Sequence, residues 1–136
     1  IIPQTVSYKT PKSIVVGYND TREAARAAFD AVPLLTAAND VRVVWVDPYK
    51  HRQSAGELPG AEMATVLARH GVKAMAEGLE SNGLNAGEAL LRLANDRGAD
   101  LLVMGAYAHS RLRQYIFGGS TQHVMEHARI PVLMSH

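Results

Sequence analysis

Short apolar runs rich in β-branched residues alternate along this chain with stretches of helical periodicity. The strand-like runs cover residues 13–18, 41–46, 72–79, 101–104 and 130–135. Apolar runs of this length, separated by helices, are typical of parallel strands that are buried on both faces. The alternation predicts an α/β fold with a doubly wound, five-stranded parallel sheet in the order 3-2-1-4-5 and helices on both faces, a Rossmann-like arrangement.

The helical stretches carry recognisable start and stop signals. Asp20 is predicted to cap the first helix while Glu23 reaches back, and Pro33 should bend or shorten that helix. Its expected buried face consists of Ala24, Ala28, Phe29, Val32 and Leu35. A second helix is expected from Ala61 to His70, and a third begins at Asn85 with Glu88, buries Ala89, Leu90, Leu93 and Ala94, and ends at Gly98.

The bulk composition describes one domain with an ordinary core. The chain has 136 residues, of which 47% are hydrophobic and 20% charged, so residues 12–136 are expected to form the domain and residues 1–11 an extension or linker. It has no cysteine, which suits a reducing cytoplasm and excludes disulfides. The net charge of +1 gives no reason to expect nucleic acid as a partner.

No secretory signal and no apolar run of about 20 residues is found, so no membrane span is expected. The first residue is Ile1, and the sequence can equally be a fragment, a processed product or one half of a longer chain.

Glycine-marked turns follow the strands that should lie at the centre of the sheet. In a doubly wound sheet, ligands bind beyond the carboxyl ends of the strands, where the strand order reverses. The exits of the first and fourth strands, residues 17–20 and 105–108, should meet there, flanked by Asp47. A further glycine pair, Gly118 and Gly119, opens the last helix, whose unpaired N–H groups can bind an anion.

The spacing of these glycines resembles that of the universal stress protein family, and the resemblance covers residues 12–136. Nucleotide-binding members carry Gly-x2-Gly-x9-Gly-[Ser/Thr] between the fourth strand and the last helix. Gly105 matches the first glycine and Gly118 the third, whereas Ala108 replaces the second and Gly119 replaces the Ser/Thr. The acidic residue that the family has after the first strand falls on Asn19, next to Asp20.

The resemblance implies an adenine nucleotide, ATP with or without Mg, as a regulatory ligand in a stress response. It implies that the backbone around Val46 binds adenine, that Asn19 and Asp20 hold the ribose, and that the glycine turns with Ser120 bind the phosphates. The complete predicted set is Tyr18, Asn19, Asp20, Val46, Gly105, Ala108, His109, Arg111, Gly118, Gly119, Ser120 and Thr121. Arg111 and His109 are included as phosphate contacts, with a solvated loop as the alternative.

Two other functions remain open. The changes at Ala108, Gly119 and Asn19 also fit a dimerising interaction module whose pocket binds another small ligand or none. A weak ATPase is the third reading, although no nucleophile elbow, cysteine nucleophile or phosphate-loop lysine is found, so no catalytic residue is assigned.

His123 and His127 stand one helical turn apart, but no third ligand has recognisable spacing, so no metal site is predicted.

As partners we expect a second copy of the chain or a sister domain in a tandem protein. A second copy would pair through the apolar final strand at 130–135, with Leu133 near the interface.

Overall fold

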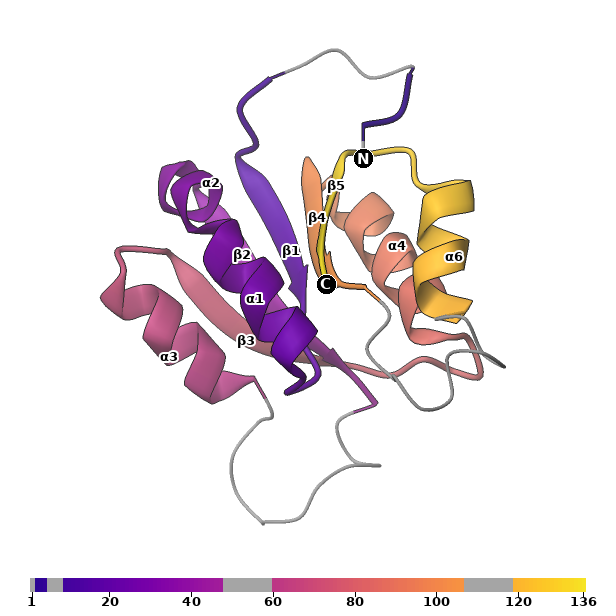
Figure 1. Ribbon diagram of the computed structural model, residues 1–136, viewed down its shortest axis with the longest axis horizontal. Helices are drawn as coiled ribbons and strands as arrows, with labels where there is room; N and C mark the ends of the chain where they lie inside the picture. Colours follow the sequence, from indigo (N-terminus) through magenta and orange to yellow (C-terminus); the bar gives the residue numbers. More distant parts are fainter. Residues whose placement is uncertain (1, 5–8, 48–59, 107–118) are drawn as a thin grey trace.

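The computed structural model of the protein describes residues 2–4, 9–47, 60–106 and 119–136 (Figure 1). Its five strands are β1 (Ser13–Gly17), β2 (Asp40–Val46), β3 (Ala74–Leu79), β4 (Leu101–Gly105) and β5 (Val132–Ser135). They form one sheet in the order β3-β2-β1-β4-β5, and every pair in it is parallel. The predicted doubly wound topology is therefore confirmed.

Helices cover both faces of the sheet, and each face has its own core (Figure 1). The helices are α1 (Arg22–Asp30), α2 (Val32–Ala37), α3 (Ala61–Arg69), α4 (Ala86–Arg97) and α6 (Gly119–His127). Ile14, Val41 and Val103 pack against α1, α2 and α3 on one face, with Leu35 and Leu67 fully buried among them. On the other face, Val15, Val44 and Leu102 pack against α4 and α6. The strands β1 and β4 bury both faces because their runs are apolar without alternation, whereas the edge strand β3 is only partly buried.

Several local predictions are confirmed. Asn85 caps α4, since its side chain accepts from the Glu88 N–H at 2.8 Å, and Gly98 ends that helix in the left-handed conformation at φ 65°. Pro33 divides the first helical stretch into α1 and α2, where it occupies the first turn of α2.

Two predictions for α1 are wrong. Thr21, not Asp20, is the N-cap, because its hydroxyl accepts from the Ala24 N–H at 3.2 Å while Asp20 adopts a left-handed backbone with φ 57°. Phe29 is 46% exposed rather than buried. The buried face of α1 consists of Ala24, Ala27 and Ala28, and these small side chains let the helix lie close to the sheet.

Two strands begin two residues later than predicted. The Val72 N–H bonds the Leu67 carbonyl at the end of α3, so β3 begins at Ala74. Pro131 has no N–H to donate and joins the ladder only through its carbonyl, which accepts from Leu102, so β5 begins at Val132 rather than Ile130. Both strands lie at the edges of the sheet, as predicted. Within the described residues, no helix has the length and apolar character that crossing a bilayer requires.

Candidate functional site

The exit of β1 lies between the exits of β2 and β4. Gly17, the last residue of β1, is paired with Val44 on one side and Met104 on the other. The Tyr18 N–H still bonds the Val44 carbonyl at 2.9 Å, and the chain then turns into α1. The exits that the sequence placed together are therefore neighbours in the sheet, at the position where its strand order reverses.

A short hydrogen-bonded turn, Tyr18 to Thr21, follows β1 at this end of the sheet. The Tyr18 hydroxyl donates to Asp20 Oδ1 at 3.2 Å, and the Thr21 hydroxyl donates to Asn19 Oδ1 at 2.8 Å. Asn19 and Asp20 are exposed, and Asp20 stands in a left-handed conformation that Asp tolerates better than most residues. The turn thus presents two polar side chains to solvent at the end of the central strand.

The Tyr18 ring is fixed by aromatic packing as well as by Asp20. It meets Trp45 edge-on, with 6.0 Å between the ring centroids. Burial, the Asp20 charge, the hydrogen bond to Asp20 and the charge of Glu62 together raise the pKa of Tyr18 to about 12. The phenol therefore stays protonated and remains a hydrogen-bond donor across the physiological range.

The main-chain groups of Val46 point past the end of β1. Backbone groups of a strand alternate between its two neighbours; the Asp47 N–H faces β3, where it bonds the Leu79 carbonyl at 2.7 Å. The Val44 carbonyl faces β1, where it accepts from Tyr18. The N–H and carbonyl of Val46 face the same way as those of Val44, and the paired part of β1 ends opposite Val44. They lie at the mouth of the crevice.

Asp47 forms a clamp between the exits of β2 and β3. Its carboxylate accepts from the Ser81 N–H at 2.9 Å and from the Ser81 hydroxyl at 2.6 Å. Ser81 is buried, and Asp47 has a left-handed backbone with φ 53°. Sequence reasoning placed Asp47 beside the crevice but missed Ser81, since no local signal links positions 34 residues apart.

Gly105, the first signature glycine, is required by packing. A Cβ at this position would stand 2.6 Å from the Ala24 nitrogen and 2.7 Å from the Glu23 carbonyl carbon. These are backbone atoms of the first turn of α1, which cannot swing aside. Gly105 therefore lets α1 rest on the end of β4, and this contact explains the glycine independently of any ligand.

The first turn of α6 lies at the same end of the molecule as these strand exits (Figure 1). Gly119 and Ser120 are half-buried, and Thr121 is buried. A Cβ on Gly119 would have no atom of the described residues within 4 Å. Ala108, His109, Arg111 and Gly118, together with Tyr107 and Arg113, lie outside the described residues.

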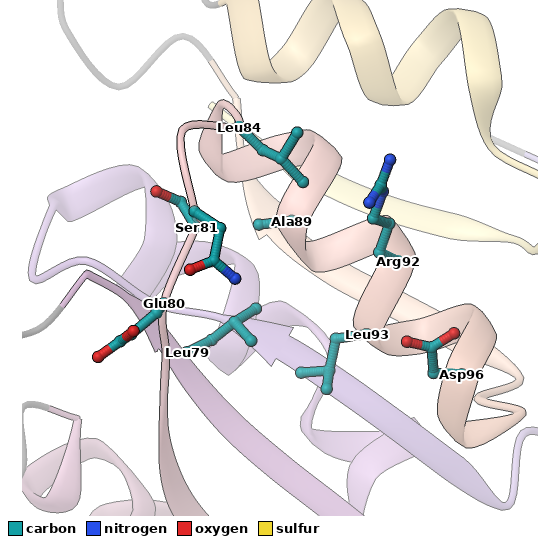
Figure 2. Close-up of a pocket in the computed structure, with 9 residues that line it drawn as sticks. Leu79, Glu80, Ser81, Leu84, Ala89, Arg92, Leu93 and Asp96 are labelled. Atoms are coloured by element: carbon teal, nitrogen blue, oxygen red, sulfur yellow. The ribbon is translucent and has the colours of Figure 1, made fainter.

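A shallow pocket of about 230 Å³ lies beside the connection between β3 and α4. Figure 2 shows Leu79, Leu84 and Leu93 inside it, with Arg92 and Asp96 of α4 at its rim. In the described part of the chain, its lining contains no residue of the predicted set. Its volume is below the roughly 300–1,000 Å³ of small-molecule sites, so we assign it no ligand.

The histidine pair of α6 forms a stack. The rings of His123 and His127 are 4.3 Å apart between centroids, and His127 Nδ1 lies 3.0 Å from the His123 carbonyl oxygen. In the ranges that the structure describes, no three His, Cys, Asp or Glu side chains gather into a group that could hold a metal ion.

Several solved structures share this fold. One is a universal stress protein in complex with cAMP (TM-score 0.66, 19% identity, covering 94% of this chain and 99% of the other). Another is the hypothetical protein MJ0577, with a TM-score of 0.72 and 19% identity, covering 93% of this chain and 96% of the other. A third is a universal stress protein from Archaeoglobus fulgidus DSM 4304, with a TM-score of 0.67 and 16% identity, covering 91% of this chain and 43% of the other.

The family follows from the sequence comparisons. Universal stress protein Slr1230 of Synechocystis is 41% identical over 81 residues, which are 60% of this chain. The match spans only 26% of that relative's length. The model of the universal stress protein family matches residues 10–136. Because this match takes in nearly the whole domain, the chain belongs to the universal stress protein family.

Proposed function

We propose that this domain binds an adenine nucleotide, ATP with or without Mg, as a regulatory ligand in a cytoplasmic stress response. The site would occupy the crevice beyond β1, with adenine at Val46, the ribose at Asn19 and Asp20, and the phosphates at the first turn of α6. Bound nucleotide would act by changing the domain's interactions rather than by turnover: Asn19 carries an amide, which is not basic enough to accept a proton, and Asp20 already accepts a hydrogen bond from the Tyr18 hydroxyl.

The observation that carries the proposal is the direction of the Val46 main chain. Its N–H can donate to adenine N1 while its carbonyl accepts from the adenine amino group. Guanine presents the opposite pattern, an N1–H donor and a carbonyl acceptor, so this strand end favours adenine. No side chain is needed for this recognition.

The remaining contacts fit a ribose and a phosphate chain. The Asn19 carbonyl oxygen accepts from Thr21, which turns its amide N–H groups toward a ribose hydroxyl as donors. Gly119 stands at a helix start where a Cβ would meet no atom of the described residues, so an anion could approach the first N–H groups of α6 there. The cAMP complex of a protein with this fold supports the same ligand class.

Isothermal titration calorimetry with Mg-ATP, Mg-GTP and adenosine tests the proposal. We expect ATP to bind and to raise the melting temperature, because a ligand that binds only the folded state stabilises it. GTP should bind at least about tenfold more weakly, because guanine cannot satisfy the Val46 N–H and carbonyl and these polar groups would stay unpaired. Absence of both heat and thermal shift at millimolar ATP would contradict the proposal.

The altered signature positions provide a matched variant pair for the same titration. Gly119→Ser restores the family's hydroxyl at a position where a Cβ would meet no atom of the described residues, so it should strengthen ATP binding without loss of stability. If ATP binds only after Ala108→Gly and Gly119→Ser are combined, the natural domain is instead the interaction module, with a pocket that has lost this ligand.

A further inference from the structure

The connection between β3 and α4 contains the pair Asn82 and Gly83 in a tight turn. The Leu84 N–H bonds the Ser81 carbonyl at 3.0 Å and closes the turn, whose two ends are labelled in Figure 2. Both central residues have a positive φ, 53° at Asn82 and 86° at Gly83. Positive φ at both positions is typical of a type I′ turn, for which Asn followed by Gly is a favoured sequence. Both residues are exposed, so the pair lies at the surface of the domain.

An asparagine followed by glycine can react with its own main chain. The Gly83 nitrogen can attack the side-chain carbonyl carbon Cγ of Asn82, and the reaction is intramolecular because the two groups belong to adjacent residues. The N–Cγ bond forms, the Cγ–Nδ2 bond breaks, and ammonia leaves with the proton that the Gly83 nitrogen loses. The product is a succinimide ring. Water then opens the ring at Cγ, which gives aspartate, or at the main-chain carbonyl carbon of residue 82, which gives isoaspartate.

The surrounding structure restrains neither reacting group. Among the described residues, the Asn82 side chain and the Gly83 N–H make no hydrogen bond, so neither has to give up a partner before they meet. A Cβ built on Gly83 would meet no atom of the described residues within 4 Å, so packing by these residues does not shield the nitrogen. Glycine itself has no side chain that would hinder the approach. The turn therefore combines the reactive sequence with room for the reaction.

The other asparagines of the chain lack this combination. Of the five asparagines, Asn82 alone precedes glycine. The others precede aspartate or alanine, whose side chains crowd the attacking nitrogen: Asn19, Asn39, Asn85 and Asn95. Asn85 is restrained further, because its Oδ1 accepts from the Glu88 N–H at 2.8 Å as the cap of α4. These four residues are internal controls for Asn82.

We infer that Asn82 is a site of spontaneous deamidation through a succinimide, with water as the only co-reactant. The inference is independent of nucleotide binding. Both products replace the neutral amide by a carboxylate, which adds a negative charge to the turn. Isoaspartate also carries the main chain through the former side-chain methylene of residue 82, so the turn becomes longer.

The longer turn acts on the clamp between the exits of β2 and β3. Ser81 directly precedes Asn82 and is held by the Asp47 carboxylate, which accepts from its N–H at 2.9 Å and from its hydroxyl at 2.6 Å. An additional main-chain carbon between Ser81 and Leu84 changes the geometry of the hydrogen bond that closes the turn. We expect Ser81 to separate from Asp47 more often in the isoaspartate form. Deamidation thus loosens the clamp as the molecule ages.

Incubation of the full chain in neutral buffer made with heavy-oxygen water, followed by tryptic peptide mapping, tests the inference. Ring opening during the incubation leaves a heavy oxygen in the product, which distinguishes it from deamidation during digestion in ordinary water. Cleavage after Lys73 and Arg92 releases Asn82 and Asn85 in one peptide, so Asn85 is the matched control. We expect Asn82 to be converted at least about tenfold faster than Asn85, with isoaspartate among the products. Equal rates, or aspartate without isoaspartate, would overturn the inference.

Gly83→Asn is the matched variant, because Asn tolerates a positive φ better than most residues. Its side chain should hinder the attack, so the conversion of Asn82 should slow at least about tenfold. Circular dichroism of the fresh variant checks that it is folded. Conversion at the unaltered rate in a folded variant would show that the glycine is not the cause and would contradict the inference. If the variant does not fold, the comparison of Asn82 with Asn85 in the unaltered chain decides.

Hydrogen exchange followed by NMR tests the effect on the clamp. Ion exchange chromatography separates the deamidated forms from the aged protein. In the isoaspartate form, the Ser81 N–H should exchange at least about tenfold faster than in the fresh protein, while the N–H groups of β1 keep their rates. Unchanged exchange at Ser81 would refute the loosening of the clamp. Faster exchange throughout β1 would also contradict it, because the whole fold would then have been destabilised.

Discussion

Tyr18 shows how one residue at a strand exit is controlled by its surroundings. Its ring packs on Trp45 and its hydroxyl donates to Asp20, so ionisation would place a phenolate beside a carboxylate in a half-buried position. Burial and these charges raise its pKa from 10.0 to about 12. Because the pKa in the folded state lies above that of the unfolded chain, the contact stabilises the fold fully below pH 10, and this stabilisation is lost as the pH rises toward 12.

We predict that Tyr18 ionises later than an unperturbed tyrosine. The difference between the alkaline absorbance titrations of the unaltered protein and Tyr18→Phe isolates this one phenol. The difference should develop near pH 12, and in an Asp20→Asn background it should move toward 10, since the neighbouring charge and the carboxylate acceptor are removed together. A difference centred at pH 10 in the unaltered protein would refute the assignment.

At the scale of elements, the two central strands are joined at their starts by a carboxylate. Asp100 precedes β4, and its Oδ2 accepts from the N–H groups of Lys12 at 2.9 Å and Ser13 at 3.1 Å, just where β1 begins. Lys9 lies 3.5 Å from the other oxygen. The hydrogen bond from Lys12 is the main cause that lowers the pKa of Asp100, with the Ser13 bond and the Lys9 charge acting in the same direction against burial.

We predict that Asp100→Asn lowers the free energy of unfolding by about 1 kcal/mol at neutral pH, because the amide oxygen can still accept from these N–H groups but forms neutral hydrogen bonds, which contribute less than those of a carboxylate. The lowered pKa means that the stabilisation is present above the ordinary value of 3.8 and is lost as the pH falls through the folded-state pKa. Urea unfolding at several pH values should therefore show the difference between the two proteins shrinking below pH 4. A difference that is independent of pH would show that the charge has no part in it.

At the scale of the whole molecule, β5 is an edge strand of the sheet in the described residues. The carbonyls of Pro131 and Ser135 accept from Leu102 and Ala106, so the main-chain groups of Met134 point away from β4. Leu133 and Met134 are half-buried and pack partly on the two cores, which leaves apolar surface along the edge. Pairing with a second copy would cover that surface and bring strand partners to the main-chain groups of Met134.

We predict that the domain forms a dimer through β5 at tens of micromolar protein, whose mass in sedimentation equilibrium is twice the 14.7 kDa of the chain. Met134→Pro removes an outward-facing N–H and spares the ladder with β4, so it should yield a folded monomer. Leu133→Lys should also dissociate the dimer, but it disturbs the core as well, so circular dichroism must accompany it. A monomer of the unaltered chain under these conditions would contradict the prediction, and a sister domain of a longer chain would then be the candidate partner.

The sequence by itself determined the sheet, its strand order and the ends of several helices. These features follow from local physics: apolar runs define buried strands, Asn85 satisfies the N–H groups of its own helix, and Gly98 adopts a backbone conformation that other residues avoid. Local rules failed at Asp20 and Phe29, where a neighbouring threonine made the better cap and small alanines took the buried face. The assignment of nucleotide contacts to the predicted site residues stays a prediction. Their spacing in the sequence indicates which residues lie together at the carboxyl ends of the strands, but it does not identify the ligand.

Only the tertiary structure decided why particular glycines and polar residues are needed. Gly105 has to be small because the first turn of α1 lies on it, and Gly87 because α6 begins on it. Asp47 finds its hydrogen-bond partner 34 residues away. Each of these contacts joins segments that are distant in the chain, and its length depends on how closely two packed elements approach. A sequence pattern records the residue type at each end of such a contact but not the distance between the ends.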